Sequence, residues 1–359
     1  MLIIAINKYI IDKLIYCKKM CENEKSFSCE VFENLLSKNI DNALTYLTKY
    51  NSIQINPAKL AQYYRENEKL MKMIIDKCDD IDQVDEKNKK LIHYVCEYGY
   101  LPTILIKKII EKTKDLESED CDGKRPIHYI CCLKNPDLIK CIVERKINLE
   151  CRDKNGMLPI HYVCKYINAK SIQLIIDEGV NLESEDNAGM RPIHYICKYA
   201  FIESLKYITE KKVDLECQDK TGMSPIHYAC ERLEKDLMIF LIEKKVDINC
   251  ANKNNIYPIH IICKRGTLEM LEYVAEKNVD LNCVDNEGMR PIHYACESLN
   301  IEMIEFLVSK GVDYESENNK GITAIKLVAS CKKPELIEYI IRNGIFTSNK
   351  RIRMDKLNI

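Results

Sequence analysis

The histidines of this chain recur at an almost constant interval, and this interval limits the possible folds more than any other feature. Their successive spacings are 35 residues once and then 33 residues five times. An Asp or Asn stands eight residues before each histidine, and a Gly or Asn follows that residue three positions later. A fixed period of this length predicts a solenoid, in which each unit buries its apolar face against its neighbours. The histidine series is His93, His128, His161, His194, His227, His260 and His293.

One unit, "DKNGMLPIHYVCKYINAKSIQLIIDEGVNLESE" at 153–185, illustrates the expected local structure. "DKNG" is a turn signal, because Asp opens turns and Gly adopts positive φ without strain. Pro159 suits the first position of a helix, where its missing N–H has no cost. "SIQLIIDE" predicts a second helix, and Gly179 suits a left-handed cap at its end. Each unit is therefore predicted to contain a turn, two short helices and an extended segment.

This arrangement resembles the ankyrin repeat. The matching residues are the Asp/Asn-x-x-Gly turn, a Pro-Ile-His core in place of the family's Pro-Leu-His, and endings such as "GVNLE" and "KVDLE". The resemblance implies an all-α ankyrin-repeat solenoid of stacked helix-turn-helix units with short hairpin-like loops. It departs from the family before the Pro, where the usual Thr is mostly absent. Only Ser224 and Thr323 offer a hydroxyl cap there, so the other helices are expected to use backbone, water or the turn Asp.

The period divides the chain into eight expected repeats flanked by atypical ends. The first repeat holds two extra residues between Cys96 and Leu116, which we place in the turn between its helices. Residues 53–84 have the same rhythm without His and are predicted to be a degenerate N-terminal capping repeat. Residues 1–52 are predicted to be an N-terminal helical segment, and 347–359 a flexible tail. The repeats within 85–346 are 85–119, 120–152, 153–185, 186–218, 219–251, 252–284, 285–317 and 318–346.

The repeated His-x-x-Cys pair has a structural and a functional interpretation. Both side chains are zinc ligands, but a structural zinc takes four ligands at about 2.0–2.3 Å, and each repeat supplies two. The next pair lies on a packed helix roughly 8–10 Å away. We therefore predict that the Cys is a small apolar core residue and that the His links its turn to the neighbouring repeat's backbone, as the resemblance implies. The structural histidines are His128, His161, His194, His227, His260 and His293.

Composition excludes several classes of function. The 54 basic and 55 acidic residues nearly balance, and no basic tract suggests a nucleic-acid partner. The sequence contains no phosphate-binding loop or catalytic motif, so we expect no enzyme activity, no cofactor, no metal and no small-molecule substrate. Nineteen cysteines without a secretory signal favour free thiols and a cytoplasmic location. The apolar run Leu2–Ile6 is too short to cross a bilayer, and membrane association is not expected.

Positions that vary in phase on the concave face are where a solenoid of this kind reads its partner. One row follows the turn Gly or Asn, and its adaptable thioethers suit either a binding strip or packing between neighbouring turns. This row is Met157, Met190, Met223, Ile256 and Met289. Arg and Tyr, which are common in binding hot spots, form a second set before the Pro and at the ends of the first helices. This set is Arg191, Tyr257, Arg290, Lys165, Tyr166, Lys198, Tyr199, Arg232 and Arg265.

Two functions fit these patterns. The first is a protein–protein interaction scaffold that binds an acidic or amphipathic partner segment on the concave face. The second is an adaptor in which the N-terminal helical segment, with apolar residues at Ile3, Ile6, Ile10 and Leu14, tethers the solenoid to a membrane, cytoskeletal or larger assembly partner.

Overall fold

The regular elements in the described part of the chain are all α-helices. The computed structural model describes residues 56–58, 61, 67–78, 80–166, 168–199, 201–330, 334–343 and 345. The expected N-terminal segment 1–52 and tail 347–359 lie outside these residues, and the expected cap 53–84 is described only in part. Contacts divide the chain into two compact units, Met1–Val180 and Asn181–Ile359. The two units are described separately.

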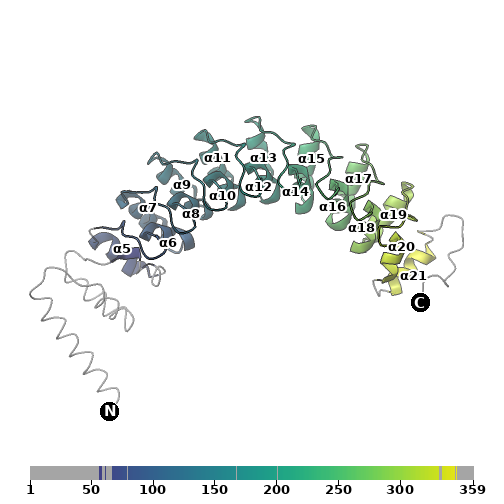
Figure 1. The fold of residues 1–359 in the computed structure, drawn as a ribbon, viewed down its shortest axis with the longest axis horizontal. Helices are drawn as coiled ribbons and strands as arrows, with labels where there is room; N and C mark the ends of the chain where they lie inside the picture. The colour runs from purple at the N-terminus through teal and green to yellow at the C-terminus, as the bar shows by residue number, and fades with distance from the viewer. Residues whose placement is uncertain are drawn as a thin grey trace, which may run out of the picture. The chain divides into compact units, whose positions relative to one another are not determined.

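Unit 1 is a stack of helix pairs, and α5 is the helix that precedes the first complete pair in the described part of the chain (Figure 1). A first helix in each pair packs against the first helix of the next pair, α6 on α8 and α8 on α10. The second helices form a parallel row, α7 on α9 and α9 on α11. The helices are α5 Glu68–Lys77, α6 Leu91–Tyr98, α7 Thr103–Lys112, α8 Pro126–Cys132, α9 Pro136–Val143, α10 Pro159–Tyr166 and α11 Ala169–Asp177.

Unit 2 repeats the same plan. Its first helices pack in the order α12, α14, α16, α18, α20, and its second helices α13, α15, α17 and α19 form the other row. The predicted solenoid of stacked helix pairs is thus confirmed. The helices are α12 Pro192–Tyr199, α13 Ile202–Thr209, α14 Pro225–Arg232, α15 Lys235–Glu243, α16 Pro258–Arg265, α17 Leu268–Ala275, α18 Pro291–Ser298, α19 Ile301–Ser309, α20 Ala324–Ser330 and α21 Pro334–Arg342.

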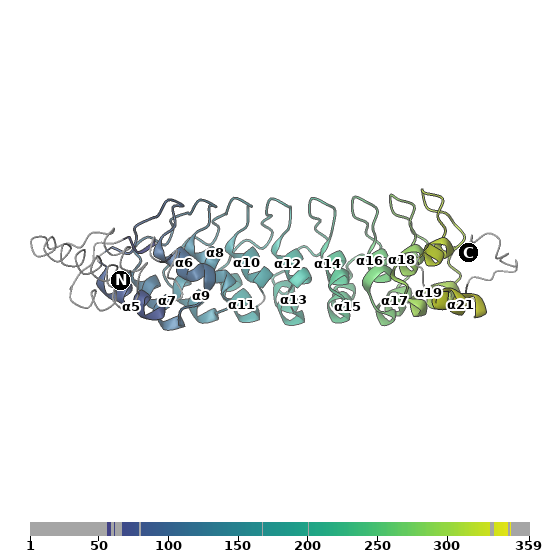
Figure 2. The same ribbon diagram turned by 90° about the horizontal axis from the view of Figure 1, so that it is seen from below.

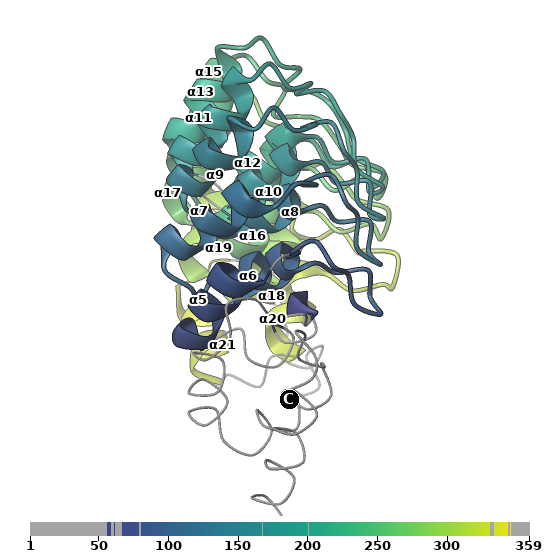
Figure 3. The same cartoon turned by 90° about the vertical axis from the view of Figure 1, so that its left-hand side faces the viewer.

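Extended loops, which we call fingers, connect each second helix to the next first helix. In each unit the fingers project from the same side of the helix rows (Figures 2 and 3). The connection between the two helices of a pair is much shorter and lies at their other end. It spans two residues in most pairs but four, 99–102, between α6 and α7, which confirms the predicted place of the two extra residues.

Local sequence explains where the helices begin. Six first helices carry Pro at their first position, from α8 to α18, where no hydrogen bond is lost. Most second helices start at an Asn or Thr whose side chain accepts a backbone N–H of the first turn. Asn168, for example, accepts the N–H of Ser171 at 3.0 Å, and Asn300 accepts that of Met303 at 3.1 Å.

The core of each unit lies between its two helix rows. The repeated Ile and Cys of the first helices are completely buried, as at Ile259 and Cys263. The second helices contribute residues such as Leu271 and Val274, which are equally buried. Small thiols in the first-helix row let neighbouring helices approach closely, which is the structural role predicted for this column.

Neighbouring fingers also contact each other directly. The N–H of Lys220 donates to the carbonyl of Ala188 at 2.9 Å, and that of Lys253 donates to Thr221 at 3.1 Å. Gly222 permits this approach: its φ is +81°, and a Cβ there would lie 2.6 Å from the backbone nitrogen of Lys253. The turn Gly is therefore required both for its conformation and for the contact between repeats.

Candidate partner-binding site

The repeated histidines are buried. Backbone groups hold both ring nitrogens of His93, His128, His194, His227 and His260, whereas Nε2 of His293 has no hydrogen-bond partner among the described residues. Nδ1 of His128 accepts the N–H of Arg125 at 3.0 Å, and Nε2 lies 3.3 Å from the carbonyl oxygen of Cys151. Because Nδ1 is an acceptor, Nε2 carries the proton and donates it. His194 and His260 repeat the pattern with the carbonyls 23 residues downstream.

This geometry refines the predicted role of the histidine. The helix starts that lack Ser or Thr are capped by His Nδ1, not by the turn Asp as one of the expected alternatives had it. For His128 the accepting carbonyl lies in the extended segment that ends the same repeat, whereas His227 donates to Ile256 of the next one at 3.1 Å. The imidazoles of His93, His128, His194 and His260 therefore bond a carbonyl of their own repeat, whereas that of His227 links two neighbouring repeats.

Burial keeps these rings neutral. It lowers the pKa of His93 and His227 to about 4, although neighbouring carbonyls and aspartates act in the opposite direction. A neutral imidazole is the form that the two backbone contacts require. The histidines are thus poor proton carriers at neutral pH.

The buried thiols are also held in their protonated form. Burial raises the pKa of Cys151, Cys217 and Cys283 to about 12. Thiolate, not thiol, is the nucleophile and the metal ligand. Within the described residues no group of three or more His, Cys, Asp or Glu side chains is arranged to hold a metal ion.

A pair of side chains that the sequence analysis missed fixes the turn. The carboxylate of Asp153 accepts the N–H groups of Asn155 and Met157 at 2.8 and 2.9 Å, and its second oxygen accepts the hydroxyl of Tyr162 at 2.6 Å. In Asp219 the cost of burial is outweighed by such hydrogen bonds, chiefly from Tyr228, and the pKa is lowered. The sequence did contain a signal for this pair. In the repeat where Asn252 replaces the turn Asp, Ile261 also replaces the Tyr, so the two residues change together.

The row after the turn Gly is largely inaccessible. Met157, Met190, Met223 and Met289 are only 5–9% exposed, and Ile256 is half-buried. Where the turn residue of the next repeat is Asn, its amide points at the sulfur: Asn252 Nδ2 lies 3.3 Å from Met223 Sδ. These contacts favour packing between neighbouring turns over a binding strip.

The arginines before the Pro are engaged by acids and carbonyls of their own finger and of the next finger. Arg191 pairs with Glu183 and also with Glu185 at 3.1 Å. Arg290 donates to the carbonyl of Asn282 at 2.7 Å and pairs with Asp313 at 3.5 Å. Tyr257 at the same position is half-buried, with its ring 5.6 Å from that of His260. These side chains fasten fingers to first helices, and their charge is largely neutralised there.

The helix-end pairs remain accessible. In unit 1, Lys165 and Tyr166 are half-buried, with the ammonium 5.9 Å from the ring centre. In unit 2, Lys198 and Tyr199 are half-buried in the same way, and Arg265 is exposed.

Two lysines of unit 2 carry unneutralised charge. Lys198 Nζ lies 5.0 Å from the centre of the Tyr228 ring, and Lys264 Nζ lies 5.2 Å from that of Tyr294. Such contacts orient an ammonium group without cancelling its charge. Within the described part of the chain neither lysine has a carboxylate within ion-pair distance. We call Lys198, Tyr199, Lys264 and Arg265 the basic surface.

Arg232, the remaining helix-end cation, is paired. Its guanidinium bonds Glu234 at 2.7–2.8 Å and lies 5.6 Å from the centre of the Phe201 ring. It therefore adds less positive charge than the sequence suggested.

Comparisons with known proteins agree with the repeat pattern. A family model described as ankyrin repeats (3 copies) matches six overlapping segments that run from residue 58 to residue 318. The matched segments are 58–153, 92–186, 129–219, 160–252, 194–285 and 226–318. A search of curated proteins gave no match. No helix among the described residues is long and apolar enough to cross a membrane.

Proposed function

Since the chain belongs to the ankyrin repeat family, whose repeats generally serve as protein–protein interaction modules, we propose that it is a scaffold that binds an acidic or amphipathic segment of another protein. The segment would lie across the exposed ends of the first helices. The observation that carries this proposal is the basic surface of unit 2, where Lys198 and Lys264 keep their charge over tyrosine rings.

Two physical arguments support this choice of partner. Carboxylates of a partner would meet ammonium groups that no intramolecular carboxylate neutralises, which speeds association and selects against basic partners. Tyr199, which is half-buried with its ring centre 5.6 Å from the ammonium of Lys198, supplies apolar contact beside the charge. An amphipathic acidic segment uses both features at once.

The free thiols also bear on the setting of the proposal. Among the described residues the cysteines from Cys96 to Cys296 form no disulfide, as is usual in a reducing compartment, so we place the scaffold in the cytoplasm. The alternative adaptor role for residues 1–52 depends on their apolar stripe alone and stays a prediction.

A labelled peptide of alternating glutamate and leucine tests the proposal by fluorescence anisotropy. We expect the wild-type chain to bind it with an affinity that falls as salt rises. The double substitution K198E/K264E should weaken binding about tenfold or more, because each change replaces an attraction by a repulsion.

The second helices provide a matched control. Lys244 and Lys277 are exposed lysines that also lie over aromatic rings, 5.3 Å from Phe240 and 4.9 Å from Tyr273. The double substitution K244E/K277E changes the charge equally but on the other helix row, and binding should persist. Equal loss in both double variants, or no binding by the wild type, would refute the proposal.

A further inference from the structure

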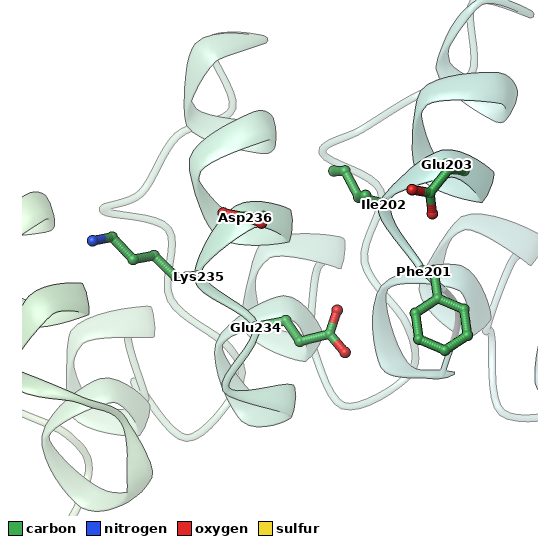
Figure 4. Close-up of a pocket in the computed structure, with 6 residues that line it drawn as sticks. All are labelled: Phe201, Ile202, Glu203, Glu234, Lys235 and Asp236. Atoms are coloured by element: carbon green, nitrogen blue, oxygen red, sulfur yellow. The ribbon is translucent and has the colours of Figure 1, made fainter.

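A separate pocket of about 370 Å³ opens beyond the C-termini of two first helices in unit 2. We call it the turn pocket. The short connections that lead into α13 and α15 form it, and Figure 4 shows its two walls. It adjoins the basic surface but contains none of its residues. The lining residues are Phe201, Ile202, Glu203, Glu234, Lys235 and Asp236.

The wall of the turn pocket that leads into α13 carries an accessible aromatic ring, because Phe201 is 54% exposed. Leu233, which precedes the lining residue Glu234 on the other connection, is 42% exposed and lies outside the lining itself. The position of Phe201 in other repeats holds Asn168, Thr267 or Asn300, which cap the helix. Phe201 provides no such cap, so its presence there does not serve the start of α13.

The pocket carries excess negative charge. Glu203 and Asp236 are exposed, and within the described residues neither has an ion pair. Lys235 does not balance them, because it pairs with Glu269 at 3.1 Å and points away from the pocket (Figure 4). Glu234 is directed toward Phe201 (Figure 4) and forms an ion pair with Arg232 at 2.7 Å. Two carboxylates thus remain without a cation.

The protein itself shows how a guanidinium fits these walls. Arg232 lies over the Phe201 ring at 5.6 Å while it bonds the carboxylate of Glu234. A planar guanidinium suits such a place better than an ammonium, because it stacks on an aromatic ring and bonds a carboxylate at the same time. The exposed part of Phe201 and the two unpaired carboxylates offer the same combination a second time.

We propose that the turn pocket binds an arginine side chain that a partner protein presents next to an apolar residue. The guanidinium would meet Glu203 and Asp236 and stack on Phe201, while the apolar neighbour would cover Leu233. This site takes a basic side chain, in contrast to the acidic segment proposed for the basic surface, and it does not depend on that proposal.

Three blocked peptides test the assignment by calorimetry with the full chain. Each has one central residue between leucines, and the central residue is arginine, lysine or citrulline, the neutral analogue of arginine. We expect the arginine peptide to bind and the lysine peptide to bind about fivefold more weakly. The citrulline peptide should bind about tenfold more weakly than the arginine peptide, or weaker still. Equal affinities for arginine and citrulline, or for arginine and lysine, would overturn the proposal.

Variants place the binding in the turn pocket. E203Q/D236N should lower the affinity for the arginine peptide about tenfold, and F201A should lower it about fivefold. Neither variant should change the affinity for the glutamate–leucine peptide. E302Q is the matched control, because Glu302 has the same position in repeat 285–317 and is also exposed, beside a capping Asn300 in place of Phe. It should bind the arginine peptide like the wild type. Unchanged binding by E203Q/D236N, or an equal loss in E302Q, would overturn the proposal.

Discussion

Single residues in this protein perform several tasks at once, and the histidine is the clearest case. His194 caps a helix through Nδ1 and holds a distant carbonyl through Nε2. The sequence was sufficient to predict a structural role, because seven equal copies do not resemble one active site. It was not sufficient to predict the acceptor, because the carbonyl of Cys217 lies 23 residues away and any backbone carbonyl would satisfy the ring.

The buried histidines predict a loss of stability in mild acid. Their pKa is lowered from 6.5, to about 4 in His93 and His227, so the unfolded chain binds more protons between these values. Stability is complete above about pH 6.5 and falls as the pH drops toward 4, by up to roughly 3 kcal/mol for each of these two residues. Urea unfolding at pH 7.5, 6 and 5 measures the free energy of unfolding above this pH range and at two points within it.

The carboxylate of Asp219 does not confuse this result. Burial alone would raise its pKa, but hydrogen bonds outweigh burial and hold the pKa below its usual 3.8, so the contribution of Asp219 is lost only in stronger acid. The variant H227Q should lose part of the dependence between pH 7.5 and 5. An unfolding midpoint that is constant over this range would contradict the assignment of neutral buried rings.

At the scale of elements, most of the described repeats place a residue in the left-handed conformation just after the second helix, although the first repeat, whose α7 is followed by Thr113 with φ of −67°, does not. Gly179 and Gly311 adopt it with φ of +80° and +72°, whereas Lys245 adopts it with φ of +67°. Side chains are strained in this region. The sequence predicted the glycine caps, but it could not show that lysine holds the same conformation, because packing of the neighbouring segments imposes it.

Replacing Lys245 by Gly should therefore stabilise the protein. The exposed lysine loses its left-handed strain, and we expect a gain of about 0.5–1 kcal/mol in the free energy of unfolding. Lys244, one position earlier, has φ of −76°. Lys244→Gly should lower stability by about the same amount, because there Gly only adds freedom to the unfolded chain. Equilibrium unfolding in urea measures both changes in the free energy of unfolding. Changes of the same sign in the two variants would contradict this explanation.

At the scale of the whole molecule, each unit is held together by its helix rows and also by its fingers. The N–H of Asn286 donates to Asn254 at 3.0 Å, and that of Asn319 donates to Glu287 at 3.0 Å, so the tips form a continuous row of hydrogen bonds in unit 2. Side chains reinforce it, since the amide of Asn319 donates to the carbonyl of Asn286 at 2.9 Å.

The glycines of the fingers test this coupling. Gly222→Ala introduces left-handed strain and also a Cβ 2.6 Å from the nitrogen of Lys253, whereas Gly321 has φ of +69° and a nearest neighbour at 3.8 Å. Gly321→Ala should cost about 1–2 kcal/mol from strain alone, and Gly222→Ala about 1–3 kcal/mol more from the clash. Hydrogen exchange at the amide of Lys253 should accelerate only in the Gly222 variant. Equal losses would show that the finger contact adds nothing.

The sequence predicted the stack because a strict period dictates which faces are buried. It could not decide whether the Met row was exposed, because the same spacing serves a strip on the surface and a row between turns. The pairing of Arg191 did leave a signal. Acids stand six and eight residues before Arg191 and before Arg125. The last repeat has the same two acids, Glu315 and Glu317, before Thr323, so the signal is not specific to arginine. The turn pocket had no signal, because its residues replace ordinary helix caps.

The self-contained hydrogen bonding of the histidine affects how such a chain can change in length. In repeats such as 120–152 the capped N–H, the ring and the accepting carbonyl of Cys151 all belong to one 33-residue unit. Duplication of a whole unit would bring every partner with it, and so preserve all three. Insertion of one or two residues between His128 and Cys151 would displace the carbonyl from the ring unless a loop absorbed them, as happens at 99–102. Arrays built in this way gain or lose whole modules more readily than single amino acids.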